Sequence, residues 1–252
     1  MLDFTSFTIL AVVLSIGILI QASSGFAAGL LAVPVLLLSG AFAVPEAQAA
    51  ILVSTTPQNL FGVWSFRQEI HWRDLLFPAI LRLTGLPIGA LILYQAEALP
   101  REAIHQGVGA GVVAIAVAML ILRPTPRASV SQAYSIPAFF FSGVMQGLIG
   151  MGGPLMVFWV QAHDWSTKRS RGFLFSMYLI SLVPAYLTLY LVFGNRIFPP
   201  MLTTVVLVPW LLVVTWFGLK LGTKLGRIRL RYFTLALLIL LGLVAVFSPY
   251  LR

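Results

Sequence analysis

The sequence predicts an all-α, polytopic membrane protein built from two related halves. Hydrophobic residues fill 60% of the 252 positions, charged residues only 9%, and the mean hydropathy is +0.98. A soluble domain carries about 25% charged residues, so this chain could not cover a water-facing surface of its size. The charges also fall in clusters between apolar stretches long enough to cross ~30 Å of hydrocarbon. These observations place most of the chain in a lipid bilayer.

Composition also limits the chemistry of the chain. Cysteine is absent, so disulfides, thiolate chemistry and cysteine metal sites are excluded. The net charge of +9 is an excess that membrane proteins gain from loops that stay in the cytoplasm, and we expect no nucleic-acid partner. The first apolar run, Phe7 to Ile20, follows Asp3 but no Lys or Arg, so it lacks the basic start of a signal peptide. We interpret it as mature membrane structure.

Ten apolar segments follow one another along the chain. Two of the gaps between them, Gln21 to Gly25 and Gln146 to Pro154, hold too few polar residues for surface loops. Backbone at membrane depth is non-helical only where it is buried in protein or lines a wet cavity, so both gaps predict broken helices. The segments cover about residues 5–20, 26–39, 47–66, 75–95, 103–122, 134–148, 153–162, 172–193, 199–219 and 232–248.

The two breaks match each other at a separation of about half the chain, and a second pair of glycines echoes later in each half. Two echoes in the same order indicate an internal repeat, in which each half is a broken helix followed by three full helices. The matched positions are Gln21 with Gln146, Gly25 with Gly150, Gly85 with Gly218, and Gly89 with Gly222.

The repeat divides the chain into residues 1–122, the first transmembrane repeat, and residues 133–252, the second. Residues 123–132 between them are rich in Pro and Ser, as expected of a connector. We expect this linker to lie in the cytoplasm.

Lys and Arg discriminate between two ways of threading the repeat. If each broken segment enters and returns on one side, the second half is inverted, and twelve basic residues face three across the membrane. If each broken segment crosses once, the split is nine to six. The positive-inside rule favours the first threading: six full spans, two re-entrant or hairpin segments, and both termini outside the inner or plasma membrane. The twelve are Arg67, Arg73, Arg123, Arg127, Lys168, Arg169, Arg171, Lys220, Lys224, Arg227, Arg229 and Arg231.

An inverted repeat with a broken helix in each half is typical of secondary transporters, whose site lies where the breaks meet near the midplane. The second half-helices, which start near Gly25 and Gly153, would point their N-termini at that place. Open helix N-termini offer unpaired N–H groups and partial positive charge, so two of them form an anion site. The candidate binding residues are Gln21, Ser23, Ser24, Gly25, Gln146, Gly150, Met151, Gly152 and Gly153. The glycines could instead serve close helix packing.

Polar residues within the spans are the other candidates. Arg82 is the only basic residue deep in a predicted span, and it either attracts the anion or snorkels to the headgroups near Arg73. Residues 55–59, Thr-Thr-Pro-Gln-Asn, either line a path or hydrogen-bond across a helix interface.

The acidic residues all lie at or near predicted span ends, and only Glu102 and His105 are placed to act in a proton relay. No cluster has metal-ligand spacing and no nucleophile has a base, so we expect no metal, no cofactor and no enzymatic activity. An anion that leaves a cell gains ~2.3 kcal/mol per charge for each 100 mV, so a missing relay favours anion export.

At the two breaks the chain resembles the TauE/SafE family of sulfite exporter-like membrane proteins. The resemblance implies transport of small sulfur-containing or organic anions, such as sulfite, sulfonates or sulfoacetate. Ser and Ala stand in the first break where the family pattern has a run of glycines. The residues that carry the resemblance are Gly25-Phe-Ala-Ala-Gly29 with Pro34, Gly147-Leu-Ile-Gly150-Met-Gly-Gly-Pro154, Pro87-Ile-Gly89, and Gly218 with Gly222.

The sequence thus predicts an alternating-access transporter that exports a sulfite- or sulfonate-like anion. An anion-conducting channel with the same breaks as its selectivity filter is the alternative. The expected partners are the anion and membrane lipids, and the sequence is compatible with a homodimer.

Overall fold

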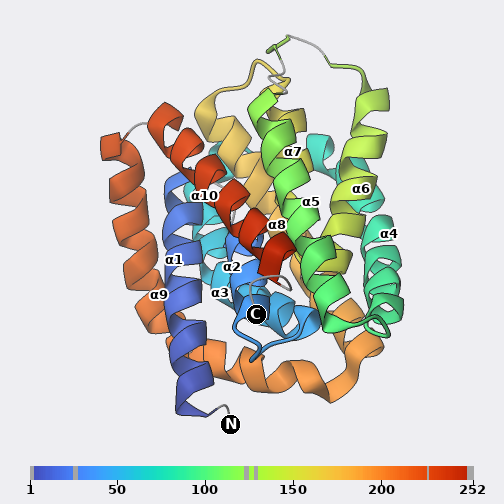
Figure 1. The fold of residues 1–252 in the computed structure, drawn as a ribbon. Coiled ribbons are helices and arrows are strands. Elements are labelled where there is room, and N and C mark those ends of the chain that lie inside the picture. Colours follow the sequence, from blue (N-terminus) through green and yellow to red (C-terminus); the bar gives the residue numbers. More distant parts are fainter. Residues whose placement is uncertain (1–2, 25–27, 122–124, 128–129, 226, 249–252) are drawn as a thin grey trace.

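The computed structural model describes residues 3–24, 28–121, 125–127, 130–225 and 227–248. The described residues form ten α-helices (Figure 1). The first half contains α1 (Phe4–Ser24), α2 (Ala28–Leu38), α3 (Val44–Ser65), α4 (Trp72–Ala96) and α5 (Arg101–Ile121). The second half contains α6 (Ser135–Ile149), α7 (Gly153–Gln161), α8 (Thr167–Phe193), α9 (Phe198–Leu225) and α10 (Arg227–Phe247). Three single turns of 3-10 helix are η1 (Arg67–Glu69), η2 (Gln132–Tyr134) and η3 (Gly194–Ile197).

The fold class is confirmed: the chain is an all-α polytopic membrane protein. Within the described residues, four helical stretches are long and apolar enough to cross a membrane: Phe4–Ser23, Trp72–Ala96, Arg101–Ile121 and Thr167–Gly218, which holds α8 and most of α9. Many large apolar side chains on these helices face outward, among them Leu191 and Val206. Such a surface suits contact with lipid tails rather than water.

The two broken segments differ in the length of their first limb. The limbs α6 and α7 hold 15 and 9 residues and α2 holds 11, so each is about 14–23 Å long and too short to cross the hydrocarbon. The limb α1, however, holds 21 residues, because the helix continues through Gln21 to Ser24 instead of ending near residue 20. The first break therefore begins a turn later than the sequence predicts.

The helices of the two halves pack in matching pairs. The contacts of α4 with α6 and of α1 with α9 are both extensive, and each becomes the other when every helix is replaced by its counterpart in the other half. The same operation pairs the contact of α3 with α9 with that of α8 with α4, whereas α3 with α8 and α5 with α10 map onto themselves. This arrangement supports two related halves; the inverted repeat itself stays a prediction.

Glycines set the closeness of the α4–α6 contact. Side chains are absent at Gly85 and Gly89 on α4 and at Gly143 and Gly147 on α6, and an added Cβ at any of them would overlap backbone of the facing helix. On the mirrored pair, Gly218 of α9 lies against the backbone of α1 in the same way. At these positions the packing interpretation of the glycines therefore holds, as in other small-residue membrane interfaces.

The buried core lies between these pairs. It includes Leu14 and Ile18 of α1, Leu30 and Leu36 of α2, and Ala50 of α3, all of them almost fully buried. The short helix α2 is apolar on all sides and is covered by α1, α3, α5 and α10, which explains why it needs no polar face.

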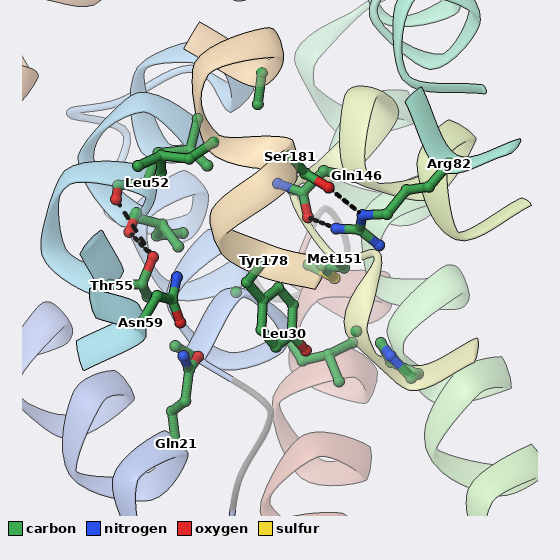
Figure 2. Close-up of a pocket in the computed structure, with 18 residues that line it drawn as sticks. Gln21, Leu30, Leu52, Thr55, Asn59, Arg82, Gln146, Met151, Tyr178 and Ser181 are labelled. Carbon is green, nitrogen blue, oxygen red and sulfur yellow. Dashed lines mark hydrogen bonds between the residues drawn. The ribbon is translucent and has the colours of Figure 1, made fainter. Parts of the chain in front are cut away.

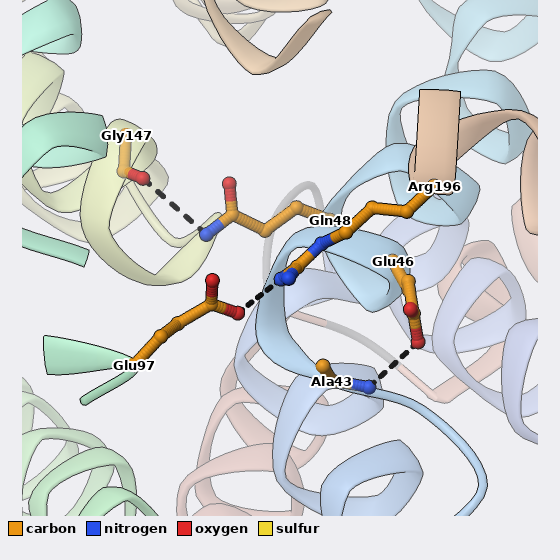
Figure 3. A network of polar contacts seen from close by, with 6 residues as sticks. All are labelled: Ala43, Glu46, Gln48, Glu97, Gly147 and Arg196. Carbon is orange, nitrogen blue, oxygen red and sulfur yellow. Dashed lines mark hydrogen bonds and ion pairs between the residues drawn. The ribbon is translucent and has the colours of Figure 1, made fainter. Parts of the chain in front are cut away.

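The loops separate to two ends of the bundle. At one end the linker residue Arg127 exchanges backbone hydrogen bonds with Ala162 and Asp164, and Arg169 pairs with Asp74 at 2.7 Å. At the other end Arg196 pairs with Glu97, and the Ala43 N–H donates to Glu46 at 2.9 Å (Figure 3). Figure 1 shows α1 beginning and α10 ending away from the linker, at the second end.

Candidate functional site

The two helix breaks meet inside the bundle. Gly29, in the first turn of α2, lies so close to the second break that an added Cβ would be 2.6 Å from the Gly150 carbonyl oxygen. Gly150 ends α6 in the left-handed conformation (φ 71°, ψ 15°), which glycine adopts without strain. Its N–H donates to the backbone carbonyl of Gln146 at 2.9 Å. After this turn, α7 begins at Gly153 with Pro154 in its first turn.

A small cavity lies where the breaks meet (Figure 2). Much of its lining is apolar. No aspartate, glutamate or histidine is among the described residues that line it. The polar lining residues are Gln21 from α1, Thr55 and Asn59 from α3, Arg82 from α4, Gln146 from α6, and Tyr178 and Ser181 from α8.

Arg82 turns into this cavity from about halfway along α4. Its side chain is 1% exposed, and its Nε donates to the Ser181 hydroxyl at 2.8 Å. Its Nη2 donates to the Gln146 side-chain oxygen at 3.4 Å, and its Nη1 donates to the Ser142 hydroxyl and the Gly152 carbonyl. Of the two roles that the sequence left open, snorkelling is therefore wrong: the guanidinium is fixed against the second break.

The charge of Arg82 has no carboxylate partner among the described residues. The two ion pairs there, Asp74–Arg169 and Glu97–Arg196, lie at the two ends of the bundle. Neutral oxygens and the ring of Tyr178, 5.8 Å from the guanidinium carbon, surround the cation instead. A buried charge without a counter-charge is expensive in a low-dielectric interior, so an anion in this cavity would be strongly stabilised.

The second break is built around the guanidinium. Ser142 donates to the Gly152 carbonyl at 2.5 Å, and the Gly152 N–H donates to the Gln146 oxygen at 3.3 Å. An added Cβ at Gly152 would lie 2.8 Å from the Arg82 guanidinium, and one at Gly153 would overlap the Tyr178 hydroxyl. These two glycines thus let the break approach the cation and the tyrosine.

Of the residues predicted in the first break, Gln21 is 8% exposed and lines the cavity. The Ser23 hydroxyl donates to the Ile20 carbonyl of its own helix at 3.0 Å. Ser24 is the last residue of α1, and Gly25 lies outside the described residues. In the second break Gln146, Gly150, Met151 and Gly153 line the cavity, while Gly152 accepts from Arg82 behind them.

The sequence allowed two roles for residues 55–59 of α3, lining a path or hydrogen-bonding across a helix interface, and the structure shows both. Thr55 and Asn59 line the cavity, whereas the Thr56 hydroxyl lies 3.5 Å from the Tyr186 hydroxyl of α8 across a helix interface. Sequence reasoning missed Ser142, Tyr178 and Ser181, which hold or cover Arg82. A hydroxyl in an apolar span is the only signal that could have marked them.

Fold and site together define a polytopic helical membrane protein with a small cavity between two helix breaks, lined by a buried arginine. The family model of the sulfite exporter TauE/SafE matches residues 9–245, and the chain belongs to this family. The resemblance at the breaks is thus confirmed, and membership implies membrane transport of sulfite or related anions rather than enzymatic catalysis. Comparison with curated proteins and with solved structures gives no match.

Proposed function

We propose that this protein is a secondary transporter that exports a small anion, sulfite or a sulfonate, and binds it in the cavity between the two breaks beside Arg82. The observation that carries the proposal is the buried Arg82 charge, which lines the cavity without a carboxylate partner in the described part of the chain. A sulfur oxyanion supplies the missing negative charge, and one of its oxygens can accept a hydrogen bond from the second N–H of Arg82 Nη2, which Gln146 does not use.

The start of α7 supplies a second attraction for the anion. Gly153 and Pro154 begin this helix on the cavity wall, so its N-terminal partial charge faces the same space as Arg82. An arginine and a helix N-terminus together offset the hydration that an anion loses on entry. The first break contributes Gln21 and Gly29 to the lining of the cavity.

Two features favour export: the negative charge of the substrate, and the lack of an acidic residue among the described residues that line the cavity. With the basic loops in the cytoplasm, the anion moves down the electrical gradient when it leaves, which supplies ~2.3 kcal/mol per charge for each 100 mV. No described acid or histidine lines the cavity to carry a coupling proton. In the proposed cycle the two halves, inverted relative to each other, rock to open the cavity to either side in turn.

The test is sulfite and ethanesulfonate counterflow in proteoliposomes with Arg82→Gln. We expect uptake to fall at least tenfold, because a charge-assisted hydrogen bond contributes about 1.5–3 kcal/mol. The matched control is Arg73→Gln, an exposed arginine on the same helix, which should transport like the wild type. Equal uptake by the folded Arg82→Gln protein would overturn the proposal, and unsaturable conductance in planar bilayers would indicate a channel.

A further inference from the structure

The cavity has two chemically different ends. The cationic end consists of Arg82, Gln146 and Ser181. The neutral end consists of Gln21, Thr55 and Asn59. Figure 2 shows the two groups on opposite sides of the cavity, with Tyr178 between them. An anion that filled only the cationic end would leave the neutral end without a partner.

Asn59 carries a buried acceptor at the neutral end that is left without a hydrogen bond in the described part of the chain. It is 3% exposed, and its Oδ1 has no partner among the described residues. A buried amide oxygen left in this way is destabilising, and such groups are rare in folded proteins. The neighbouring Gln58 is 4% exposed and also has no partner for its amide, so this turn of α3 is polar beyond what its packing uses.

Thr55 gives the neutral end the same character. Its hydroxyl proton is donated to the Ile51 carbonyl at 2.9 Å, so the hydroxyl oxygen is left as an acceptor. The Asn59 Oδ1 is an acceptor as well. At the cationic end Arg82 is a hydrogen-bond donor, whereas the Thr55 hydroxyl oxygen and Asn59 Oδ1 are acceptors that need a donor from the ligand.

We infer that the substrate is an anion with two heads: an acid group for Arg82 and, a short chain away, a hydroxyl that donates to Asn59 and Thr55. The inference rests on the proposed function and deepens it. A hydroxyl fits better than an ammonium group, because no described carboxylate lines the cavity to pair with a second positive charge. Asn59 is then the residue that selects a hydroxyalkyl sulfonate over its plain analogue.

The decisive experiment compares ligand pairs on the purified full-length protein by calorimetry. Wild-type protein should bind 2-hydroxyethanesulfonate about tenfold more tightly than ethanesulfonate, the value of one good hydrogen bond. Asn59→Leu should bind the two ligands with equal affinity, because the hydroxyl then has no partner at that position. The control Thr56→Val, a polar-to-apolar change on the same helix but outside the cavity lining, should keep the tenfold preference.

A second variant gives a result that mere destabilisation could not produce. Asn59→Asp places a carboxylate at the neutral end, so the preference should move to 2-aminoethanesulfonate, whose ammonium group it can pair with. Equal binding of the first two ligands by wild-type protein, or an unchanged preference in Asn59→Leu, would overturn the inference and leave the proposed function standing. Failure of the wild-type protein to bind sulfite or any of the sulfonates would overturn both.

Discussion

Arg82 shows what a position in the sequence can and cannot determine. Its depth in the membrane is predicted by counting along an apolar span, and the structure shows its side chain buried within the protein. Its direction does not follow, because a long flexible side chain reaches either the headgroups or the interior from the same place. The residues that fix it, Ser142 and Ser181, come from other helices, and no periodicity reports which way a lone serine faces in an apolar span.

A substitution at Gln146 tests the structural role of the second break separately from its role in binding the anion. The Gln146 oxygen accepts from Arg82 and from the Gly152 N–H, so Gln146→Glu keeps the geometry and adds a negative charge. We expect the variant to be more stable, by about 1–3 kcal/mol, because a charged pair replaces a neutral hydrogen bond beside a buried cation. We also expect anion uptake to fall more than tenfold, because the new carboxylate occupies the charge that the substrate needs.

Thermal unfolding and counterflow on the same preparation measure both effects. Gln132→Glu, at the exposed start of η2, makes the same chemical change away from the site and should alter neither quantity. A Gln146→Glu protein that is stabilised but transports at the wild-type rate would show that the substrate does not use the Arg82 charge.

At the scale of helices, the sequence predicted the breaks better than their boundaries. Glycine runs and Pro154 interrupt a helix for local reasons, so the second break lies where it was predicted. The first break begins late because Gln21, Ala22 and Ser23 are compatible with a helix and are buried, so packing keeps α1 helical to Ser24. The dual use of glycine, for packing at Gly147 and for the turn at Gly150, could not be separated without the contacts.

The α4–α6 contact gives a prediction at this scale. Gly143→Ala places a Cβ on the Arg82 backbone, so the two helices must move apart, at a cost of about 1–3 kcal/mol. Gly107→Ala on α5 is the control: nothing lies within 4 Å of the added Cβ, and the better helix propensity should leave the protein as stable or slightly more so. The measurement is the melting temperature of the wild-type protein and of both variants in the same detergent, and Gly143→Ala should melt at the lowest temperature. Equal values for the two variants would contradict the tight contact.

For the whole molecule, two ion pairs tie the same two helices at both ends. Asp74 with Arg169 joins the starts of α4 and α8, and Glu97, just after α4, pairs with Arg196 of η3, which follows α8. The loops at the first end carry many basic residues and those at the second end few, and this asymmetry is the basis on which the positive-inside rule predicts the two sides. The central cavity could not be placed in the same way, because it depends on how helices far apart in the sequence pack together.

The orientation of the molecule can be tested directly because the chain has no cysteine. Ser131→Cys, in the linker, and Asn195→Cys, in η3, place single thiols at exposed positions at opposite ends of the bundle. In intact cells an impermeant maleimide should label Asn195→Cys and should label Ser131→Cys only after the membrane is permeabilised. The reverse pattern would place the basic loops outside and remove the electrical argument for export. Labelling of both thiols in intact cells would contradict the threading itself, because the two positions would then share one side of the membrane.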